Sequence, residues 1–507
     1  MAISNTNRVV KNTVFLYIRM AIVMLVSLLT VRVAYNQLGQ VDYGVYSVVG
    51  GTVFALSFIS YVLSSAAVRF FAYDIGENNI EHLKTSFTTI FVSFLVAIGL
   101  ILVLAETIGL WLVNYKLNMP EGYETVVNWI YQTSLISFVA IVISAPYSAM
   151  IVAFEEMNFF ALVGIVDVLL KLLAAYLLAF VSNDKLLYYS VFLCIANFGT
   201  ASFYIIYTII QHKECKSFLT FDKSLFKSVF SYSSWTMFGS VSGLFTTQGL
   251  NVILNIFFGP IVNTAYSVSH QVSSAVNSFG MSFFSAIRPG IIKSYASGDV
   301  IYLNRLFNMG NKILAILMLV IVVPLFVEAD VILKIWLGEV SGYVVVFTRL
   351  VLVYTFIFIL SNPITTIIQA ANRVKIYHKI VDSFTLVSLP LAYVCFLFKL
   401  DASYSYYILI IVFFVAHFLR LFILRKYFSF SIRCYTMNFL LPVVAVAVVT
   451  IACSFFVKSL LVGNSIYSTL AVVAFSVALP SVVSLFTLFS VDERGVIYSR
   501  IKHRIIY

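Results

Sequence analysis

Two oppositely charged side chains stand four positions apart in an otherwise apolar segment of the chain. They are Asp167 and Lys171, within "GIVDVLLKLLAAYLL". In a helix this spacing puts both side chains on one face, where they can form an ion pair. Such a pair is either a self-neutralised structural contact or a site that couples to a proton or ion. The sequence leaves both interpretations open, and it adds Asp382 as another acidic group for ion coupling.

An arginine lies inside the first long apolar segment. Arg19 falls well within the predicted helix 13–35, roughly 10 Å from its start at about 1.5 Å per residue. Because this depth is far for a side chain that reaches back to the interface, we expect Arg19 to face a polar cavity. A guanidinium can hold an anion such as a phosphate through paired hydrogen bonds. Arg32, near the outer end of the same segment, is expected to extend to the interface.

The composition explains why charges inside these segments matter. The chain has 507 residues, of which 61% are hydrophobic and 10% are charged. Soluble proteins carry roughly 25% charged residues, so this chain is predicted to be an all-α integral membrane protein. Its net charge of +11 is expected to come from basic cytoplasmic loops, and we expect no nucleic-acid partner.

Apolar runs of spanning length predict about fourteen transmembrane helices. They cover residues 13–35, 44–68, 87–113, 125–153, 157–181, 186–210, 228–257, 261–286, 307–327, 342–371, 377–398, 403–424, 437–457 and 465–490. Most lysines and arginines then fall in the loops and helix ends on one side, Arg420 among them, which predicts that both termini are cytoplasmic.

Two halves of the sequence resemble each other. "LGQVDYGVYSVVG" at 38–50 and "FGPIVNTAYSVSH" at 258–270 align at an offset of 220 residues, so that Gly39 matches Gly259 and Ser47 matches Ser267. "SAPYSAMIVAFEEMN" and "SNPITTIIQAANRVK" match further along. We therefore predict two parallel six-helix repeats, an arrangement known from transporters. The predicted domains are a lobe at 1–212, a lobe at 213–430 and a two-helix tail at 431–507.

Polar residues concentrate on four of the predicted helices. Helices 1, 2, 7 and 8 are expected to line a cavity between the halves, because polar groups in a bilayer must face protein or water. Close packing of small residues explains many of the serines as well. It explains the larger polar side chains less well: Gln248, Asn251, His270, Gln271 and Asn277. For His270, titration in the cavity and a structural hydrogen bond both remain open.

Two arginines occupy equivalent positions of the repeat. Arg69 and Arg288 end predicted helices 2 and 8 on the cytoplasmic side. They can attract an anionic head group at the mouth of the cavity, or they can simply anchor the helices by the positive-inside rule.

Several motifs of enzyme sites are missing from the sequence. It contains no phosphate-binding G-x-x-x-x-G-K-[ST] loop, no H-E-x-x-H and no G-x-S-x-G. The five cysteines have no metal-binding spacing. We therefore expect no catalytic residue, no metal site and no cofactor.

Three segments carry a resemblance to a known family. The stretch "NTVFLYIRMAIVMLVSLLTVRVAYNQLGQVDYGVYSVVGG", the following "SSAAVRFFAYDIG" and "SAPYSAMIVAFEEMN" resemble bacterial polysaccharide-biosynthesis flippases of the O-antigen and capsule type. These belong to the superfamily of multidrug, oligosaccharidyl-lipid and polysaccharide exporters. The resemblance implies two lobes forming a V, with alternating access. It also implies transport of undecaprenyl-diphosphate-linked oligosaccharide from the cytoplasmic to the periplasmic leaflet of the bacterial inner membrane.

The resemblance also suggests residues and partners. Related flippases bind the diphosphate in a cationic cavity with arginines on helices 1, 2 and 8. Here Arg19 lies on helix 1, whereas Arg69 and Arg288 stand only at the inner ends of helices 2 and 8. The implied partners are the lipid-linked oligosaccharide, membrane lipids, and the polymerase and chain-length proteins of polysaccharide assembly. The alternatives are a cation-coupled small-molecule exporter of the same superfamily and, less favoured, a membrane enzyme of polysaccharide assembly.

Overall fold

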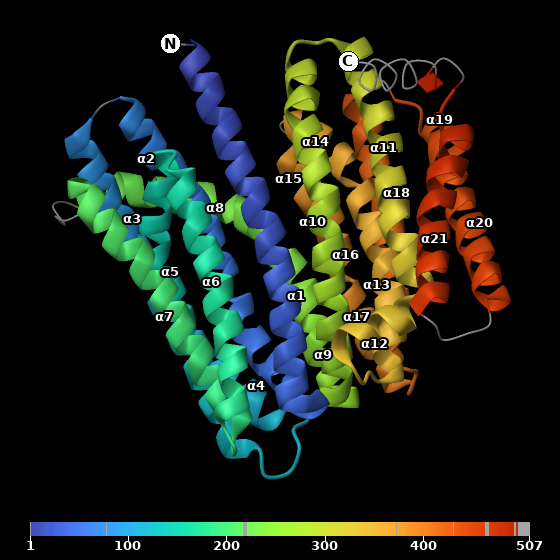
Figure 1. The fold of residues 1–507 in the computed structure, drawn as a ribbon. Helices are drawn as coiled ribbons and strands as arrows, with labels where there is room; N and C mark the ends of the chain where they lie inside the picture. Colours follow the sequence, from blue (N-terminus) through green and yellow to red (C-terminus); the bar gives the residue numbers. More distant parts are fainter. Residues whose placement is uncertain are drawn as a thin grey trace. The chain divides into compact units, whose positions relative to one another are not determined.

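The computed structural model describes residues 2–77, 79–215, 221–371, 373–428, 430–461, 466–490 and 493–494. Over these residues the chain is helical and contains no strand, as predicted (Figure 1). It forms two compact units, Met1–Ser267 and Val268–Tyr507. The lobe boundaries predicted at 212/213 and 430/431 are boundaries of the sequence repeat, and they stay a prediction.

The N-terminal unit holds the helices α1 to α9 and the first turns of α10. Their bounds are α1 (Ala2–Ala55), α2 (Phe58–Gly76), α3 (Ile80–Leu104), α4 (Leu110–Tyr115), α5 (Glu124–Ala153), α6 (Met157–Leu177), α7 (Lys185–Gln211), α8 (Lys223–Leu244), α9 (Leu250–Phe258) and α10 (Pro260–Ala296).

The C-terminal unit holds the rest of α10 and the helices that follow it. These are α11 (Val300–Val327), α12 (Ala329–Leu337), α13 (Gly342–Leu360), α14 (Asn362–Ala370), α15 (Val374–Tyr377), α16 (Ser383–Leu386), α17 (Ser388–Leu397), α18 (Tyr404–Tyr427), α19 (Ile432–Tyr435), α20 (Leu441–Leu460) and α21 (Ile466–Thr487).

Eleven helical stretches in the described residues are long and apolar enough to cross a membrane. The first, Arg19–Gly76, covers most of the predicted helix 13–35 and all of the predicted helix 44–68. The predicted helices 228–257 and 261–286 are absent from this set. They form α8, α9 and much of α10, and the serine and asparagine content of α10 lowers its mean hydropathy. The count of fourteen spans therefore stays a prediction.

Helix α5 is the centre of the N-terminal unit. It packs against α1, α2, α3 and α7, while α6 lies along both α1 and α7 (Figure 1). Large side chains such as Tyr131 and Phe138 fill the space between these helices and are at most 2% exposed. The Tyr131 hydroxyl donates to the Ala105 carbonyl at 2.7 Å, at the start of the π-helical turn η1 (Ala105–Gly109). Tyr131 of α5 thus provides a hydrogen-bond donor for a carbonyl of the π-helical turn.

In the C-terminal unit, two helices organise the packing. Helix α11 contacts α13, α20 and α21, and α18 contacts α13, α14 and α17. The two-helix tail, α20 and α21, therefore packs along α11 and belongs to the same compact unit.

The repeat seen in the sequence is reproduced in the backbone. The segment 36–43 was expected to be a loop, but α1 continues through it and is interrupted only at Gly39, where φ is 79° and ψ is 177°. Gly259, the equivalent residue 220 positions on, has a φ of 77° and a ψ of −173° between α9 and α10. This backbone region is essentially restricted to glycine. The same break therefore separates the first two helices of each repeat.

Repeat-related residues also contact one another within the N-terminal unit. The Ser47 and Ser267 hydroxyls, which are equivalent positions, form a hydrogen bond. The Thr264 hydroxyl donates to the Gln40 carbonyl at 2.5 Å. In the reciprocal contact, Gly44 lies so close to the Pro260 carbonyl that an added Cβ would be 2.0 Å from its oxygen. Equivalent residues that touch each other this way lie beside a local two-fold axis.

Replacing Gly39 by alanine should lower stability by roughly 1–3 kcal/mol, because a Cβ disfavours this backbone conformation. Gly259→Ala should have a similar effect. Thermal unfolding of the detergent-purified variants measures both. Gly99→Ala is the matched control, since Gly99 lies inside α3 with open space around its Cα, and alanine there is expected to be neutral or stabilising. Equal stability of all three variants would contradict the proposed constraint.

Candidate functional site

A pocket of about 250 Å³ opens inside the N-terminal unit, among α1, α5, α6 and α7. It contains one predicted substrate residue, Arg19, and both members of the predicted pair, Asp167 and Lys171. Its other polar side chains come from the neighbouring helices: Ser144 of α5, and Asn197, Thr200 and Tyr204 of α7.

Helical spacing brings these side chains together. On α6, residues 164, 167, 168 and 171 follow the three- and four-residue steps that define one helix face. On α7, residues 197, 200, 201 and 204 do the same. Since α6 packs against α7 and α1, the two polar faces meet on the side where Arg19 enters.

Asp167 and Lys171 form the predicted ion pair. The Lys171 Nζ lies 2.9 Å from Asp167 Oδ2, and the two side chains are 35% and 24% exposed, respectively. The Thr200 hydroxyl donates to Asp167 Oδ1 at 3.1 Å. The carboxylate is thus bound on both oxygens, while the ammonium keeps hydrogens that can be directed into the pocket.

Arg19 is held differently. Its guanidinium carbon lies 4.6 Å from the centre of the Phe160 ring, a cation–π contact. Its Nε is buried without a hydrogen-bond partner among the described residues. Gly164 makes room for it, because a Cβ on Gly164 would lie 2.3 Å from that Nε.

The charges of the pocket do not cancel. Arg19 and Lys171 are two cations, and Asp167 is the one acidic residue in the lining. Lys171 is paired with Asp167, whereas no described acidic side chain forms an ion pair with Arg19. Among the described residues the guanidinium thus has no carboxylate partner, and its planar donors match the oxygens of a phosphate-sized anion.

The other two predicted arginines do not join this pocket. Arg69 on α2 and Arg288 on α10 are both exposed. Arg288 Nη2 donates to Gln369 Oε1 at 3.4 Å, a long contact within the C-terminal unit. Their predicted role at the mouth of a cavity stays a prediction.

Gln248 and Asn251 lie close to α1 in the N-terminal unit. Gln248 is in the π-helical turn η4 (Phe245–Gly249), and its buried Oε1 has no described partner. Asn251 is 3% exposed and belongs to a buried amide network. Asn263 Nδ2 donates to Asn251 Oδ1 at 2.8 Å, and Asn255 Nδ2 donates to Asn263 Oδ1 at 2.7 Å. These contacts give Asn251 a structural role in joining α9 to the start of α10.

The remaining predicted residues lie in the C-terminal unit. His270, Gln271 and Asn277 are half-buried on α10, and the Asn277 Oδ1 has no described partner. Asp382 lies in the π-helical turn η5 (His378–Asp382), where its Oδ2 is 2.5 Å from His378 Nδ1. None of the four lines the Arg19 pocket, and their functional roles stay predictions.

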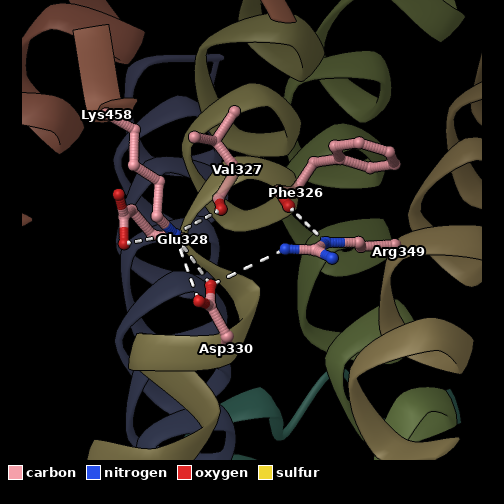
Figure 2. Close-up of polar contacts among 6 residues, drawn as sticks. All are labelled: Phe326, Val327, Glu328, Asp330, Arg349 and Lys458. Carbon is pink, nitrogen blue, oxygen red and sulfur yellow. Dashed lines mark hydrogen bonds and ion pairs between the residues drawn. The ribbon is translucent and has the colours of Figure 1, made fainter. Parts of the chain in front are cut away.

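An ion cluster holds the tail helix α20 against this unit (Figure 2). The Lys458 ammonium lies 3.1 Å from Glu328 Oε2 and 2.9 Å from Asp330 Oδ1, and it donates to the Val327 carbonyl at 3.1 Å. Arg349 donates from Nε to the Phe326 carbonyl at 3.0 Å, and its Nη2 is 3.6 Å from Asp330 Oδ1. Glu328 is only 1% exposed, so Lys458 neutralises a buried carboxylate.

Comparison with known proteins identifies the family. The family model described as polysaccharide biosynthesis protein matches residues 9–295, more than half of the chain. The chain belongs to this family. None of the curated proteins compared with it matches.

Solved structures share the fold of this polysaccharide biosynthesis protein. The lipid II flippase MurJ in an inward closed conformation is 13% identical, with a TM-score of 0.70 over 94% of this chain and 98% of its own. An inward-facing multidrug resistance transporter of the MATE family is 12% identical, with a TM-score of 0.67 over 81% and 97%. The MATE multidrug transporter DinF-BH is 16% identical, with a TM-score of 0.60 over 84% and 97%. These likenesses establish a transporter fold.

Sequence reasoning missed part of the site in this family member. Asn197, Thr200 and Tyr204 recur at three- and four-residue steps in an apolar helix, a signal that was available. Arg420, predicted at a cytoplasmic helix end, lies near the C-terminal end of α18, and its side of the membrane stays a prediction. Arg420 is 4% exposed, and its Nε donates to the Tyr377 hydroxyl at 3.2 Å.

Lys458→Met should destabilise the C-terminal unit, because it leaves the Glu328 carboxylate buried without its cation. We expect the free energy of unfolding to fall by roughly 2–3 kcal/mol. Breaking a fully buried ion pair costs roughly 3–5 kcal/mol, and the cost here is smaller because Lys458 is partly exposed. Thermal unfolding in detergent at pH 7 measures the loss. Lys334→Met, at an exposed position on α12, is the control and should be neutral. Equal stability of both variants would contradict the cluster's role.

The same cluster predicts a dependence on pH. Burial raises the pKa of Asp330, but its hydrogen bonds and the positive charges of Lys458 and Arg349 together outweigh burial and hold the pKa below its usual value. A carboxyl with a depressed pKa stabilises the fold above its unfolded pKa of roughly 3.9 and loses this effect as the pH falls further. The wild type should therefore lose more stability than Lys458→Met when the pH is lowered from 5 towards 3.

Proposed function

We propose that this chain is a flippase that moves undecaprenyl-diphosphate-linked oligosaccharide from the cytoplasmic to the periplasmic leaflet by alternating access. The oligosaccharide would be a repeat unit of O-antigen, capsule or exopolysaccharide. The observation that carries the proposal is the Arg19 guanidinium, which lines a pocket and lacks both a carboxylate partner and a hydrogen-bond partner at Nε among the described residues.

A diphosphate carries too much charge to enter hydrocarbon without compensation. Arg19 offers a planar set of donors that matches phosphate oxygens, and Lys171 adds a second cation within the same pocket. The negative charge of Asp167 offsets part of the positive charge of the pocket. This would keep the affinity for the diphosphate low enough for its release. Asn197, Thr200 and Ser144 supply neutral hydrogen-bonding groups beside the two cations.

Membership of the polysaccharide biosynthesis family supports this substrate class. The shared fold with a protein described as a lipid II flippase supports the transport step. We further propose a location in the bacterial inner membrane with both termini cytoplasmic, in line with the distribution of lysines and arginines. Polymerase and chain-length proteins of polysaccharide assembly are the proposed partners. Arg69 and Arg288 are proposed to attract the head group at the cytoplasmic side.

Arg19→Ala should abolish surface polysaccharide while leaving the amount of protein in the membrane unchanged. Arg19→Lys should restore part of the export, because it keeps the charge but loses the paired donors. The measurement is immunoblotting of surface polysaccharide in a strain that depends on this chain. Arg32→Ala removes an exposed arginine of the same helix and is the control, with export unchanged. Normal export by Arg19→Ala would refute the diphosphate role of Arg19.

A second candidate function is cation-coupled export of small molecules. The observation that favours it is the Asp167 carboxylate, which lies in the pocket and accepts from Thr200. Such a carboxylate can bind a proton or a cation when Lys171 moves away. The fold shared with MATE transporters supports this alternative equally. Asp167, Lys171 and Asp382 are the proposed coupling residues.

The double variant Asp167→Leu with Lys171→Leu separates coupling from structure. Asp167→Asn alone should lower stability by roughly 1–2 kcal/mol, because it leaves a half-buried ammonium without its counter-ion. The double variant should recover that stability, as measured by thermal unfolding. Transport recovers with it if the pair is only structural. If the pair couples to an ion, stability recovers but transport in vesicles no longer responds to a proton or sodium gradient.

A further inference from the structure

A second pocket, of about 290 Å³, is lined by residues of the C-terminal unit and shares no lining residue with the Arg19 pocket. It opens between the first half of α11 and the segment that joins α18 to α20. The volume is close to the lower end for small-molecule sites, roughly 300 Å³. In our predicted topology this end of α11 is cytoplasmic.

Asparagine dominates the polar part of this pocket. Asn304, Asn308 and Asn311 recur on α11 at steps of four and three, which puts their amides in a row along one helix face. Asn438 faces them from the π-helical turn η6 (Thr436–Leu440), together with Ser431 before α19. A π-helical turn widens a helix locally and is frequent at functional sites.

One of these amides is incompletely bonded. Asn311 is 1% exposed, and its Nδ2 donates to the Phe307 carbonyl at 2.8 Å. Its Oδ1 is buried and accepts no hydrogen bond from the described residues. A buried acceptor without a donor is destabilising, so a ligand that donates to this oxygen would relieve that cost on binding.

The charged groups of the pocket neutralise each other. The Lys312 Nζ lies 3.0 Å and 2.7 Å from the two oxygens of Glu493. Burial raises the pKa of Glu493, but hydrogen bonds from Lys312 and Ser490 and the charge of Lys312 together outweigh burial and hold the pKa below its usual value. The carboxylate is therefore ionised at neutral pH, and neither partner is free to bind an ionic ligand.

Aromatic rings form the apolar wall. Phe430 and Tyr435 lie 5.5 Å apart between ring centres, and Tyr435 and Phe439 lie 5.0 Å apart. All three rings line the pocket. Among the described residues the pocket thus combines amides, which both donate and accept, with ring surfaces and no unpaired charge. That combination suits a ring bearing several hydroxyl groups on its edge and C–H bonds on its faces.

We propose that this asparagine pocket binds a neutral sugar ring of monosaccharide size. Hydroxyls of the sugar would donate to the Asn311 and Asn308 carbonyls and accept from the Asn304 and Asn438 amide groups, while a face of the ring would contact the aromatic wall. This inference does not depend on the flippase function, because it concerns binding and not transport. A sugar site on the cytoplasmic side would sense soluble sugars or hold the sugar part of a glycolipid.

A thiol in the pocket makes the proposal measurable. Cys434 lines the pocket and is exposed. N-ethylmaleimide labelling of Cys434 in the purified chain is followed by peptide mass spectrometry. With a neutral probe such as N-acetylglucosamine or methyl glucoside at ten times its dissociation constant, labelling of Cys434 should slow about tenfold, because about one site in eleven is then free. After unfolding in sodium dodecyl sulfate, Cys434 should react at the same rate with and without the probe.

Variants test whether the asparagines carry the effect. Asn308→Leu, at an exposed position of α11, should abolish the protection of Cys434. Asn362→Leu, on α14 outside the lining, should keep it. Glucuronate and inorganic phosphate should protect less than neutral sugars. The same assay in nanodiscs containing a neutral glycolipid distinguishes a membrane-borne sugar from a soluble one.

Three results would overturn the proposal. One is the absence of protection by every neutral sugar in both detergent and nanodiscs. Another is protection that persists in Asn308→Leu. The third is protection by phosphate or glucuronate alone, which would assign the pocket to anions. Since none of these readouts uses export, they can be separated from a failure of the Arg19 experiment.

Discussion

Hydrocarbon offers no hydrogen-bond partner, so each polar group within the membrane must find one inside the protein. The Asp167 carboxylate obtains Lys171 and Thr200. The Glu328 carboxylate, buried in the C-terminal unit, obtains Lys458. Against this background, groups left incompletely bonded stand out. The Nε of Arg19 and the Oδ1 of Asn311 are two such atoms among the described residues, and both belong to residues that line pockets.

Features that depend on position along one helix could be predicted from the sequence. Asp167 and Lys171 pair because residues four apart share a helix face, whatever packs around them. The correspondence of Gly39 and Gly259 was visible as an aligned repeat, and both residues adopt the same glycine-specific backbone conformation. The depth of Arg19 in an apolar segment likewise indicated that its guanidinium would need a polar or aromatic environment.

Features that depend on which helices pack together could not be predicted in this way. Thr200 reaches Asp167 only because α7 lies beside α6, and Lys458 reaches Glu328 only because the tail packs along α11. Charge patterns also treat every basic residue near a helix end alike, so they could not show that the Arg420 side chain is 4% exposed and donates to Tyr377. Hydropathy, in turn, ranks α10 low because of its serines, although small polar residues are common where membrane helices pack closely.

The hydrogen bond between Ser47 and Ser267 carries information about ancestry. Residues at matching positions of a repeat touch only near a two-fold axis, as they would in a dimer of identical chains. In a one-repeat ancestor, a single substitution would have altered both sides of this contact at once. Duplication and fusion would remove that restriction. The equivalent residues Gly44 and Thr264 illustrate the result. Gly44 of the first repeat allows the Pro260 carbonyl to approach closely, whereas Thr264 of the second repeat donates a hydrogen bond to the Gln40 carbonyl.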